Sequence, residues 1–207
     1  AVGVVLVVAV NEGLAWWHNS NSARASDQLY AALEQASSGD LTGAEAALDQ
    51  IAAQGGGYAT LALFKKASLL GKQGKNAEAV AVYDQVASTE NNPRLRELAQ
   101  VLAGYLLVDA GDAAQVEQRL GGLAETGALR NAAREAIGLA KYKAGDFDGA
   151  RQIFQDVMND SAAGDVRGRV QLYLMQLAAD GTGAEAAPAA EPAPAAEATP
   201  PAPAAEP

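Results

Sequence analysis

The sequence predicts an all-α protein, a right-handed solenoid of stacked helical hairpins, and three observations support this fold. Between residues 24 and 179 the chain is rich in Ala, Leu, Gln and Glu, which favour helices. Gly39, Gly74, Gly111 and Gly145 each precede an apolar helical stretch, and they are separated by 35, 37 and 34 residues. Small and large apolar residues recur at fixed offsets from these glycines. A period of this length is typical of solenoids.

The first element is the apolar stretch over residues 1–17, which ends in Trp16 and Trp17. Spanning a bilayer takes about 20 apolar helical residues, and the sequence starts without an initiator Met. We therefore interpret 1–17 as the C-terminal part of a transmembrane helix with its indoles at the headgroup level. A juxtamembrane linker over 18–23 follows.

Two alternatives for residues 1–17 remain open. The stretch could be the apolar region of a cleaved signal peptide, although no small-x-small cleavage site is obvious after Trp17. It could also be a buried strand, although no other segment of the chain offers that strand a partner.

Four helical hairpins follow over residues 24–162, divided as 24–57, 58–92, 93–126 and 127–162. In each unit the first helix ends at the glycine and the second begins just after it. A small residue lies seven positions before each glycine, and a large one nine positions after it. The small set is Ala32, Ala67, Gly104 and Gly138, and the large set is Leu48, Tyr83, Leu120 and Phe154. We expect the small residue to allow close helix approach and the large residue to fill the gap to the next unit.

Polar residues and one proline mark where helices start. Asp40, Asn76, Asp112 and Asp146 follow the four glycines and are expected to cap the second helices. Pro93 lies between the second and third units, where a new helix begins.

The C-terminal part of the chain has two elements. Residues 163–180 are expected to form an amphipathic helix that caps the exposed end of the stack. Residues 181–207 contain 12 Ala, 7 of the 8 prolines and 4 Glu, but no aromatic, branched aliphatic or basic residue. Because such a segment buries too little apolar surface to offset its ordering entropy, we expect a disordered tail, partly in polyproline II.

The composition excludes several classes of function. The chain has no Cys, so it offers no disulfide, thiolate metal site or cysteine nucleophile. The single His, His18, argues against His-based metal clusters and Ser/His/Asp triads within the chain. The net charge of −10 repels nucleic acid. We therefore predict a non-enzymatic protein with no cofactor, no metal and no small-molecule substrate.

The period and the small–Gly–Ala–aromatic spacing resemble the tetratricopeptide repeat (TPR), and AIGLAKYKAGDFDGARQIFQDVMND in the fourth unit is the best match. The layout of an apolar N-terminal helix, four such units and an Ala/Pro/Glu tail resembles the bacterial single-pass membrane TPR proteins that are ancillary subunits of the SecYEG translocon. This resemblance covers residues 1–179. It implies an inner-membrane protein with a periplasmic repeat domain, which acts as an interaction scaffold near the translocon and hands clients to periplasmic chaperones. The alternative is a secreted periplasmic TPR regulator of envelope division or assembly.

A TPR stack lines its concave groove with the first helix of each unit. The usual offsets place there the residues Leu29, Leu33, Phe64, Val101, Tyr105, Val108, Leu139 and Tyr142, together with Ala36, Ser68, Gly71 and Glu135. The chain lacks the set of Lys, Arg and Asn with which chaperone-type TPR domains grip a peptide carboxylate; only Lys72 and Lys143 lie at a neighbouring offset.

This lining suits a hydrophobic segment or an amphipathic helix of a partner protein. The expected partners are translocon subunits, periplasmic chaperones or hydrophobic client segments. Two alternatives stay open. The residues could merely pack within and between units, or the capping helix or the tail could occupy the groove.

Overall fold

The computed structural model describes residues 23–179. Within this range the regular structure is entirely helical, which confirms the all-α prediction for this part of the chain. A helix over 23–38 is followed by α2 (Leu41–Gln54), α3 (Gly57–Lys72), α4 (Asn76–Thr89), α5 (Pro93–Ala110), α6 (Ala113–Thr126), α7 (Arg130–Lys143), α8 (Phe147–Asn159) and α9 (Asp165–Ala179). The predicted membrane segment over 1–17 and the tail over 181–207 lie outside the described residues. None of the helices within 23–179 has the length and apolarity needed to cross a membrane.

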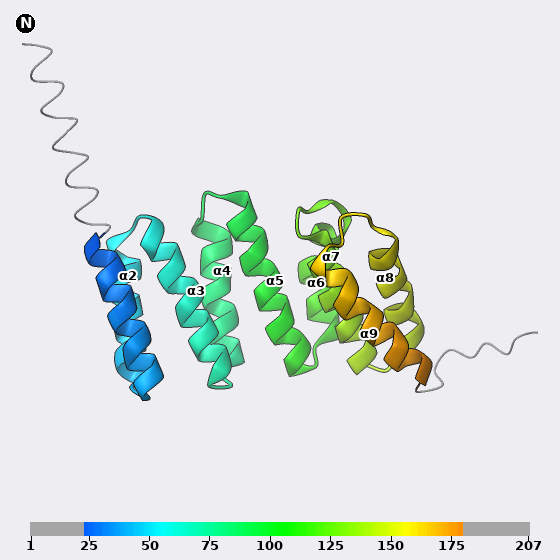
Figure 1. Cartoon of the computed structure of the whole chain (residues 1–207), viewed down its shortest axis with the longest axis horizontal. Helices are drawn as coiled ribbons and strands as arrows, with labels where there is room; N and C mark the ends of the chain where they lie inside the picture. The colour runs from blue at the N-terminus through cyan, green and yellow to red at the C-terminus, as the bar shows by residue number, and fades with distance from the viewer. Residues whose placement is uncertain (1–22, 180–207) are drawn as a thin grey trace, which may run out of the picture.

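The helices form hairpins that stand side by side in a row (Figure 1). Consecutive helices pack on each other throughout, and first helices also meet across units, as α5 does with α7. A solenoid of this kind is stabilised by contacts between neighbouring repeats.

The buried core lies between the hairpins as well as within them. In the first cluster, Leu29 of the helix over 23–38 and Leu48 of α2 pack with Ala62 of α3. In the next, Ala67 of α3 and Tyr83 of α4 pack with α5. Helix α9 takes the corresponding place beside the last unit, where its buried side chains pack with those of α8. No unit therefore has a core that is independent of its neighbour.

The small residues seven positions before the turn glycines allow the two helices of a unit to approach closely. A Cβ atom added at Gly104 would lie 2.5 Å from Leu120 Cδ1, and one added at Gly138 would lie 2.4 Å from Phe154 Cε1. Leu120 and Phe154 are fully buried. Each large side chain thus lies directly against the backbone of its own unit's first helix.

The turns of the hairpins use left-handed glycine followed by a capping residue. Gly111 has φ of 83° and ends α5, and Asp112 then accepts a hydrogen bond from the Gln115 amide at 2.9 Å. Asp40 and Asp146 cap α2 and α8 in the same way. Such side chains satisfy amides that have no partner within the helix.

The prediction that Asn76 caps the second helix of unit two is wrong. Asn76 is the first residue of α4, and the capping position is held by Lys75, which makes no side-chain capping bond. The reason is register, because the capping residue directly follows the glycine in every hairpin. In unit two that residue is a lysine, which has no acceptor atom.

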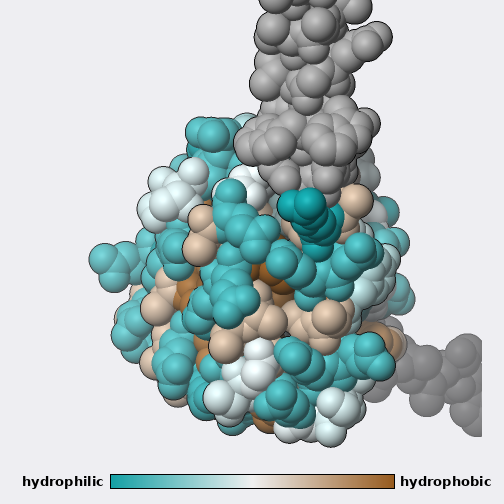
Figure 2. All heavy atoms as spheres, turned by 90° about the vertical axis from the view of Figure 1, so that its left-hand side faces the viewer, coloured by the Kyte–Doolittle hydropathy of each residue, from teal (hydrophilic) through white to brown (hydrophobic). Residues whose placement is uncertain are grey.

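The N-terminal end of the row is largely hydrophilic on its outer side. Figure 2 looks at this end and shows polar side chains surrounding a smaller area of apolar surface. Arg24, Asp27, Gln28 and Glu34 of the helix over 23–38 are all exposed. Within residues 23–179 this helix is the first of the stack, and a polar outer face is typical of the end of a solenoid.

Candidate protein-binding groove

The predicted groove residues differ in how far they are buried. Leu29, Val101 and Val108 are buried, with 6%, 2% and 4% of their surface exposed, and they belong to the hydrophobic core. The others are half-buried; these are Leu33, Phe64, Tyr105, Leu139 and Tyr142. The buried three pack within and between units, and the half-buried side chains keep part of their surface on the groove face.

Two of the half-buried aromatic rings pack against rings of the second helices. Phe64 lies 5.9 Å from Tyr83 between ring centroids, and Tyr142 lies 5.5 Å from Phe147 in an edge-to-face arrangement. Such pairs favour particular ring orientations, and they contribute stability beyond that from the burial of apolar area. Phe64 and Tyr142 therefore link the two helices of their own units.

At the C-terminal end, one polar network joins α5 and α7, the first helices of units three and four, to the capping helix α9. Tyr105 of α5 donates its hydroxyl hydrogen to Glu135 Oε2 of α7 at 2.7 Å. Arg169 of α9 donates to both oxygens of the same carboxylate, through Nε at 2.7 Å and Nη2 at 2.5 Å. A two-pronged arginine–carboxylate contact of this type is strong and directional.

The network is buried on the Glu135 side and open on the Arg169 side. Glu135 is only 1% exposed, whereas 49% of the Arg169 side chain is accessible. Burial, followed by the hydrogen bond to Glu135, raises the pKa of Tyr105 above its usual value. The hydrogen bonds to Glu135 likewise raise the pKa of Arg169. Tyr105 and Glu135, both at predicted groove positions, thus bond to each other and to the capping helix.

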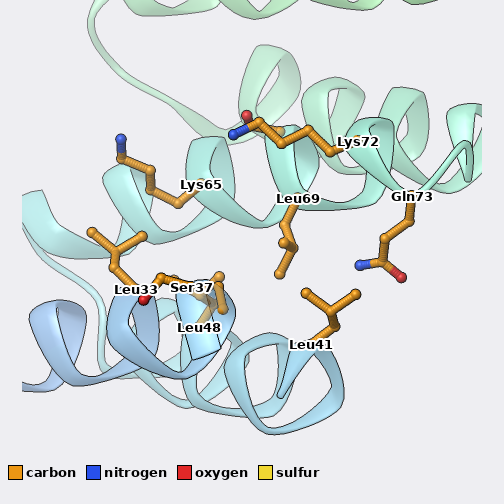
Figure 3. A pocket seen from close by; sticks show the side chains of 10 residues that line it. Leu33, Ser37, Leu41, Leu48, Lys65, Leu69, Lys72 and Gln73 are labelled. Atoms are coloured by element: carbon orange, nitrogen blue, oxygen red, sulfur yellow. The ribbon is translucent and has the colours of Figure 1, made fainter. Parts of the chain in front are cut away.

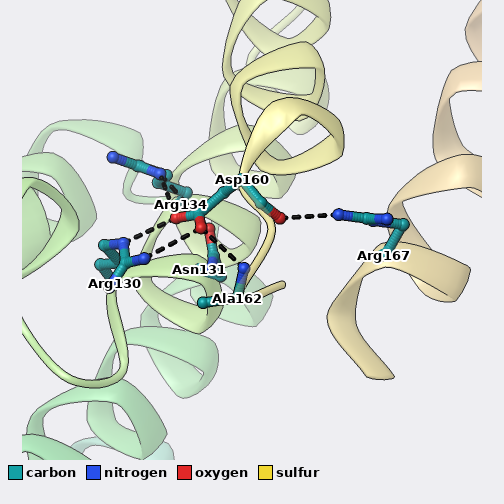
Figure 4. Close-up of polar contacts among 6 residues, drawn as sticks. All are labelled: Arg130, Asn131, Arg134, Asp160, Ala162 and Arg167. Atoms are coloured by element: carbon teal, nitrogen blue, oxygen red, sulfur yellow. Dashed lines mark hydrogen bonds and ion pairs between the residues drawn. The ribbon is translucent and has the colours of Figure 1, made fainter. Parts of the chain in front are cut away.

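A second network holds the loop that leads into α9. Asp160 accepts hydrogen bonds from Arg130 Nε at 2.6 Å and Nη2 at 2.9 Å, and from the Ala162 amide at 2.9 Å. Arg167 of α9 donates to the backbone oxygen of Asp160 at 2.7 Å (Figure 4). The bonds from Arg130 and from the Ala162 amide hold the pKa of Asp160 well below its usual range. Together with Arg169, these contacts fasten α9 against unit four.

At the N-terminal end, a cavity of about 390 Å³ opens between the helix over 23–38 and α3. We call this cavity the notch. It is lined by Leu33, Ala36, Ser37, Leu41, Leu48, Lys65, Ser68, Leu69, Lys72 and Gln73. Leu33, Ala36 and Ser68 are at predicted groove positions, so the notch lies on the predicted groove face.

The notch has an apolar floor and a polar rim. Leu48 is buried at its base, and Leu33, Leu41 and Leu69 are half-buried. Figure 3 shows Leu41 and Leu69 pointing toward one another across the space, with Lys65 and Lys72 extending from α3. Ser37, Ser68 and both lysines are exposed. The floor suits an apolar side chain, and the rim suits an anion or a hydrogen-bonding backbone.

The two rim lysines differ from the lysines around them. Lys66 donates to both carboxylate oxygens of Asp49 at 2.6 and 2.7 Å, and Lys75 contacts Glu45 at 3.3 Å. Within residues 23–179, neither Lys65 nor Lys72 makes an ion pair or hydrogen bond. Lys72 was noted beside the groove offsets but Lys65 was missed, and the spacing of seven residues between the two was the signal that could have found it.

Among residues 23–179 there is also no group of three or more His, Asp and Glu side chains placed to hold a metal ion. Stacked hairpins with an accessible first-helix face define an α-solenoid of the protein-interaction class. The chain belongs to the tetratricopeptide repeat-like domain family, whose model matches residues 1–179. Domains of this family mediate protein–protein interactions and are generally non-catalytic scaffolds. No curated protein and no solved structure matches the chain.

Proposed function

We propose that this protein is a membrane-anchored protein–protein interaction scaffold of the bacterial inner membrane, with its repeat domain in the periplasm. The observation that carries the proposal is the notch, an accessible cavity on the groove face of a stack whose C-terminal helices are joined by their own polar network. A tether at the membrane raises the effective concentration of the repeat domain near membrane partners.

The chemistry of the notch favours binding over catalysis. Ser37 and Ser68 are its only hydroxyl groups, and its lining includes no His, Asp or Glu that could deprotonate them. Lys65 and Lys72 are the remaining candidate bases, but both are exposed and neither forms a hydrogen bond with a serine. A serine nucleophile needs such a base within hydrogen-bond reach. We therefore propose a scaffold that is not an enzyme and uses no cofactor.

The apolar segment over 1–17 supports the membrane anchor. The family match starts at residue 1 and so includes this segment together with the repeats. A chain of net charge −10 is not drawn to anionic headgroups, so membrane retention has to come from apolar burial. A position beside the Sec translocon, from which clients pass to periplasmic chaperones, follows from the resemblance in layout.

A second candidate is a secreted periplasmic regulator of envelope division or assembly. The observation that favours it is the apolar composition of residues 1–17, which the apolar region of a signal peptide shares with a membrane anchor. In that case residues 1–17 would belong to a cleaved signal rather than to an anchor.

Carbonate extraction of washed membranes distinguishes the two candidates. We expect the full chain to remain with the membrane, and a Leu6→Arg/Val8→Arg variant to be released, because each charge in a membrane helix is costly. A Thr182→Arg/Thr199→Arg variant adds the same charge outside the apolar stretch and is the matched control, which should remain bound. Complete release of the unaltered chain would refute the anchor.

Crosslinking in intact bacteria then tests the partners. We expect translocon subunits or periplasmic chaperones among the captured proteins, identified by mass spectrometry. Capture of division or cell-wall assembly proteins alone would favour the regulator, and capture of cytoplasmic proteins alone would contradict both candidates.

A further inference from the structure

We propose that the notch binds an acidic and apolar segment of a partner protein, in which one bulky apolar side chain enters the cavity and flanking carboxylates pair with Lys65 and Lys72. This inference rests on the proposed scaffold function and names the chemistry of its ligand. It concerns an internal segment of the partner rather than a chain terminus.

The floor of the notch determines the apolar part of the ligand. Leu33, Leu41, Leu48 and Leu69 converge on a space of about 390 Å³ between two hairpins. Apolar surface around such a space is stabilised when an apolar side chain displaces water from it. A leucine or phenylalanine fits this description, whereas a fully polar peptide would leave the floor unfilled.

The rim determines the charged part. Lys65 and Lys72 are seven residues apart on α3, which is about two helical turns or roughly 10 Å along the axis. The neighbouring Lys66 and Lys75 already contact carboxylates of this protein. The ammonium groups that remain available to a ligand here are therefore those of Lys65 and Lys72 at the notch. Two free ammonium groups on an otherwise acidic protein are complementary to a ligand that carries carboxylates.

The spacing of the lysines sets the spacing of the carboxylates. Three residues of polyproline II chain also span roughly 10 Å, and three residues make one turn, so side chains three positions apart lie on the same side. A ligand with acidic residues three positions apart and apolar residues between them therefore matches both the rim and the floor. The exposed hydroxyls of Ser37 and Ser68 are placed to contact its backbone.

The protein's own tail fits this site less well. Residues 181–207 carry four Glu and no basic residue, so their charge matches the rim. However, they contain no aromatic or branched aliphatic side chain to fill the floor. The observations thus favour a partner segment as the occupant.

The test measures peptide binding to the full chain in detergent micelles by fluorescence anisotropy. The probe is a labelled peptide with blocked ends and the core Glu-Leu-Phe-Glu flanked by Gly and Ser. We expect saturable binding that weakens at least tenfold for Lys65→Gln and for Lys72→Gln, and that weakens with added salt. Lys66→Gln removes the same charge from the adjacent position and should change the affinity less than twofold.

Peptide controls separate the two parts of the ligand. Replacing both Glu by Gln, or replacing Leu-Phe by Ala-Ala, should each weaken binding at least tenfold. Ser68→Glu places a carboxylate on the rim between the two lysines and should also weaken binding, with the helical content of the variant checked by circular dichroism.

Several outcomes would overturn the inference. These are no saturable binding of the probe, equal effects of Lys66→Gln and Lys65→Gln, and a peptide of residues 181–207 that competes as well as the unlabelled probe. A peptide that binds only with a free C-terminal carboxylate would also overturn it. If the peptide fails while crosslinking in cells still captures partners, the ligand chemistry is wrong and the scaffold function stands.

Discussion

The two ends of the groove face have the same repeated geometry, but the N-terminal end has an accessible cavity and the C-terminal end has a buried polar network. A residue six positions before one turn glycine can be paired with the residue ten positions before the next turn glycine. Each such pair lies at the corresponding place between two successive units. These pairs are Leu33 and Phe64, Ser68 and Val101, and Tyr105 and Glu135. Of the three, Tyr105 and Glu135 form a hydrogen bond, which Arg169 of the capping helix completes. The N-terminal pairs leave the notch accessible, and the C-terminal pair joins three helices.

The same division appears in the packing of the hairpins. At the position seven residues before the turn glycine, units one and two have the fully buried Ala32 and Ala67, whereas units three and four have Gly104 and Gly138. The C-terminal half therefore depends on the absence of a Cβ atom, which lets Leu120 and Phe154 lie against the backbone. The C-terminal half thus combines glycine-dependent contacts with a buried carboxylate network, whereas the described part of the N-terminal half has alanine at these positions and no buried carboxylate.

The largest effect that tests this difference should come from Arg169→Ala. It removes the bidentate partner of Glu135, which is 1% exposed, and leaves a buried carboxylate with one hydrogen bond, that from Tyr105. Breaking a buried pair in this way costs about 3–5 kcal/mol. Because the Arg169 side chain is half-exposed and water reaches it, we expect a loss near the lower end, about 3 kcal/mol, by urea unfolding.

Hydrogen exchange shows where that loss occurs. Amide protection should fall in α7 and α9 and stay unchanged in α3, because the network does not extend to units one and two. Arg167→Ala removes the same charge from the same helix but gives up only a bond to a backbone oxygen, so its effect should be clearly smaller. A uniform loss of protection along the stack would contradict the division into two halves.

A smaller loss is expected from Gly138→Ala. The added Cβ would lie 2.4 Å from Phe154 Cε1 and 2.9 Å from Cζ, and the ring is fully buried. Overpacking of this kind costs about 1–3 kcal/mol. Thermal unfolding followed by circular dichroism measures the change.

Gly122→Ala in α6 is the matched control. Nothing lies within 4 Å of a Cβ at this position, and Gly in a helix is less favourable than Ala. We therefore expect a gain of about 0.5–1 kcal/mol. If Gly138→Ala lowers the stability and Gly122→Ala raises it, the close approach of α7 and α8 is supported. A stabilising Gly138→Ala would refute it.

Local rules in the sequence were enough to predict the helical fold. A left-handed glycine followed by Asp specifies a turn and a helix start within four residues, and no distant contact is needed to recognise it. This is why Asp40, Asp112 and Asp146 were correctly assigned as caps. Asn76 was misassigned because a good capping residue lay one position beyond the true capping site.

The candidate site was less predictable because its properties depend on distant partners. The groove offsets identified a helix face, but Leu29, Val101 and Val108 are buried since a first helix packs against neighbours on both sides. Arg169 belongs to the capping helix, which lies outside the four repeated units, so no groove offset marks it. Lys65 and Lys66 are adjacent and chemically identical, and only the packing of α2 on α3 decides which one meets Asp49.

The smallest expected effect concerns unit two, the hairpin without a side-chain cap. Lys75 has φ of −80° and ψ of 55°, close to the −79° and 72° of Asp40, so the backbone already has the form that a capping residue requires. Lys75→Ser supplies an acceptor for the Glu78 amide, and such caps contribute about 1 kcal/mol. It also removes the exposed contact of Lys75 with Glu45, which contributes less than about 0.5 kcal/mol. We expect a net gain of about 0.5 kcal/mol by urea unfolding.

Asp112→Ala provides the reciprocal measurement in unit three. It deletes an acceptor that now bonds the Gln115 amide at 2.9 Å, so a loss of about 1 kcal/mol is expected. Hydrogen exchange at Glu78 should slow in Lys75→Ser and exchange at Gln115 should quicken in Asp112→Ala, because each change acts on a single first-turn amide. If the serine leaves both stability and exchange unaltered, the missing cap does not distinguish unit two from the other hairpins.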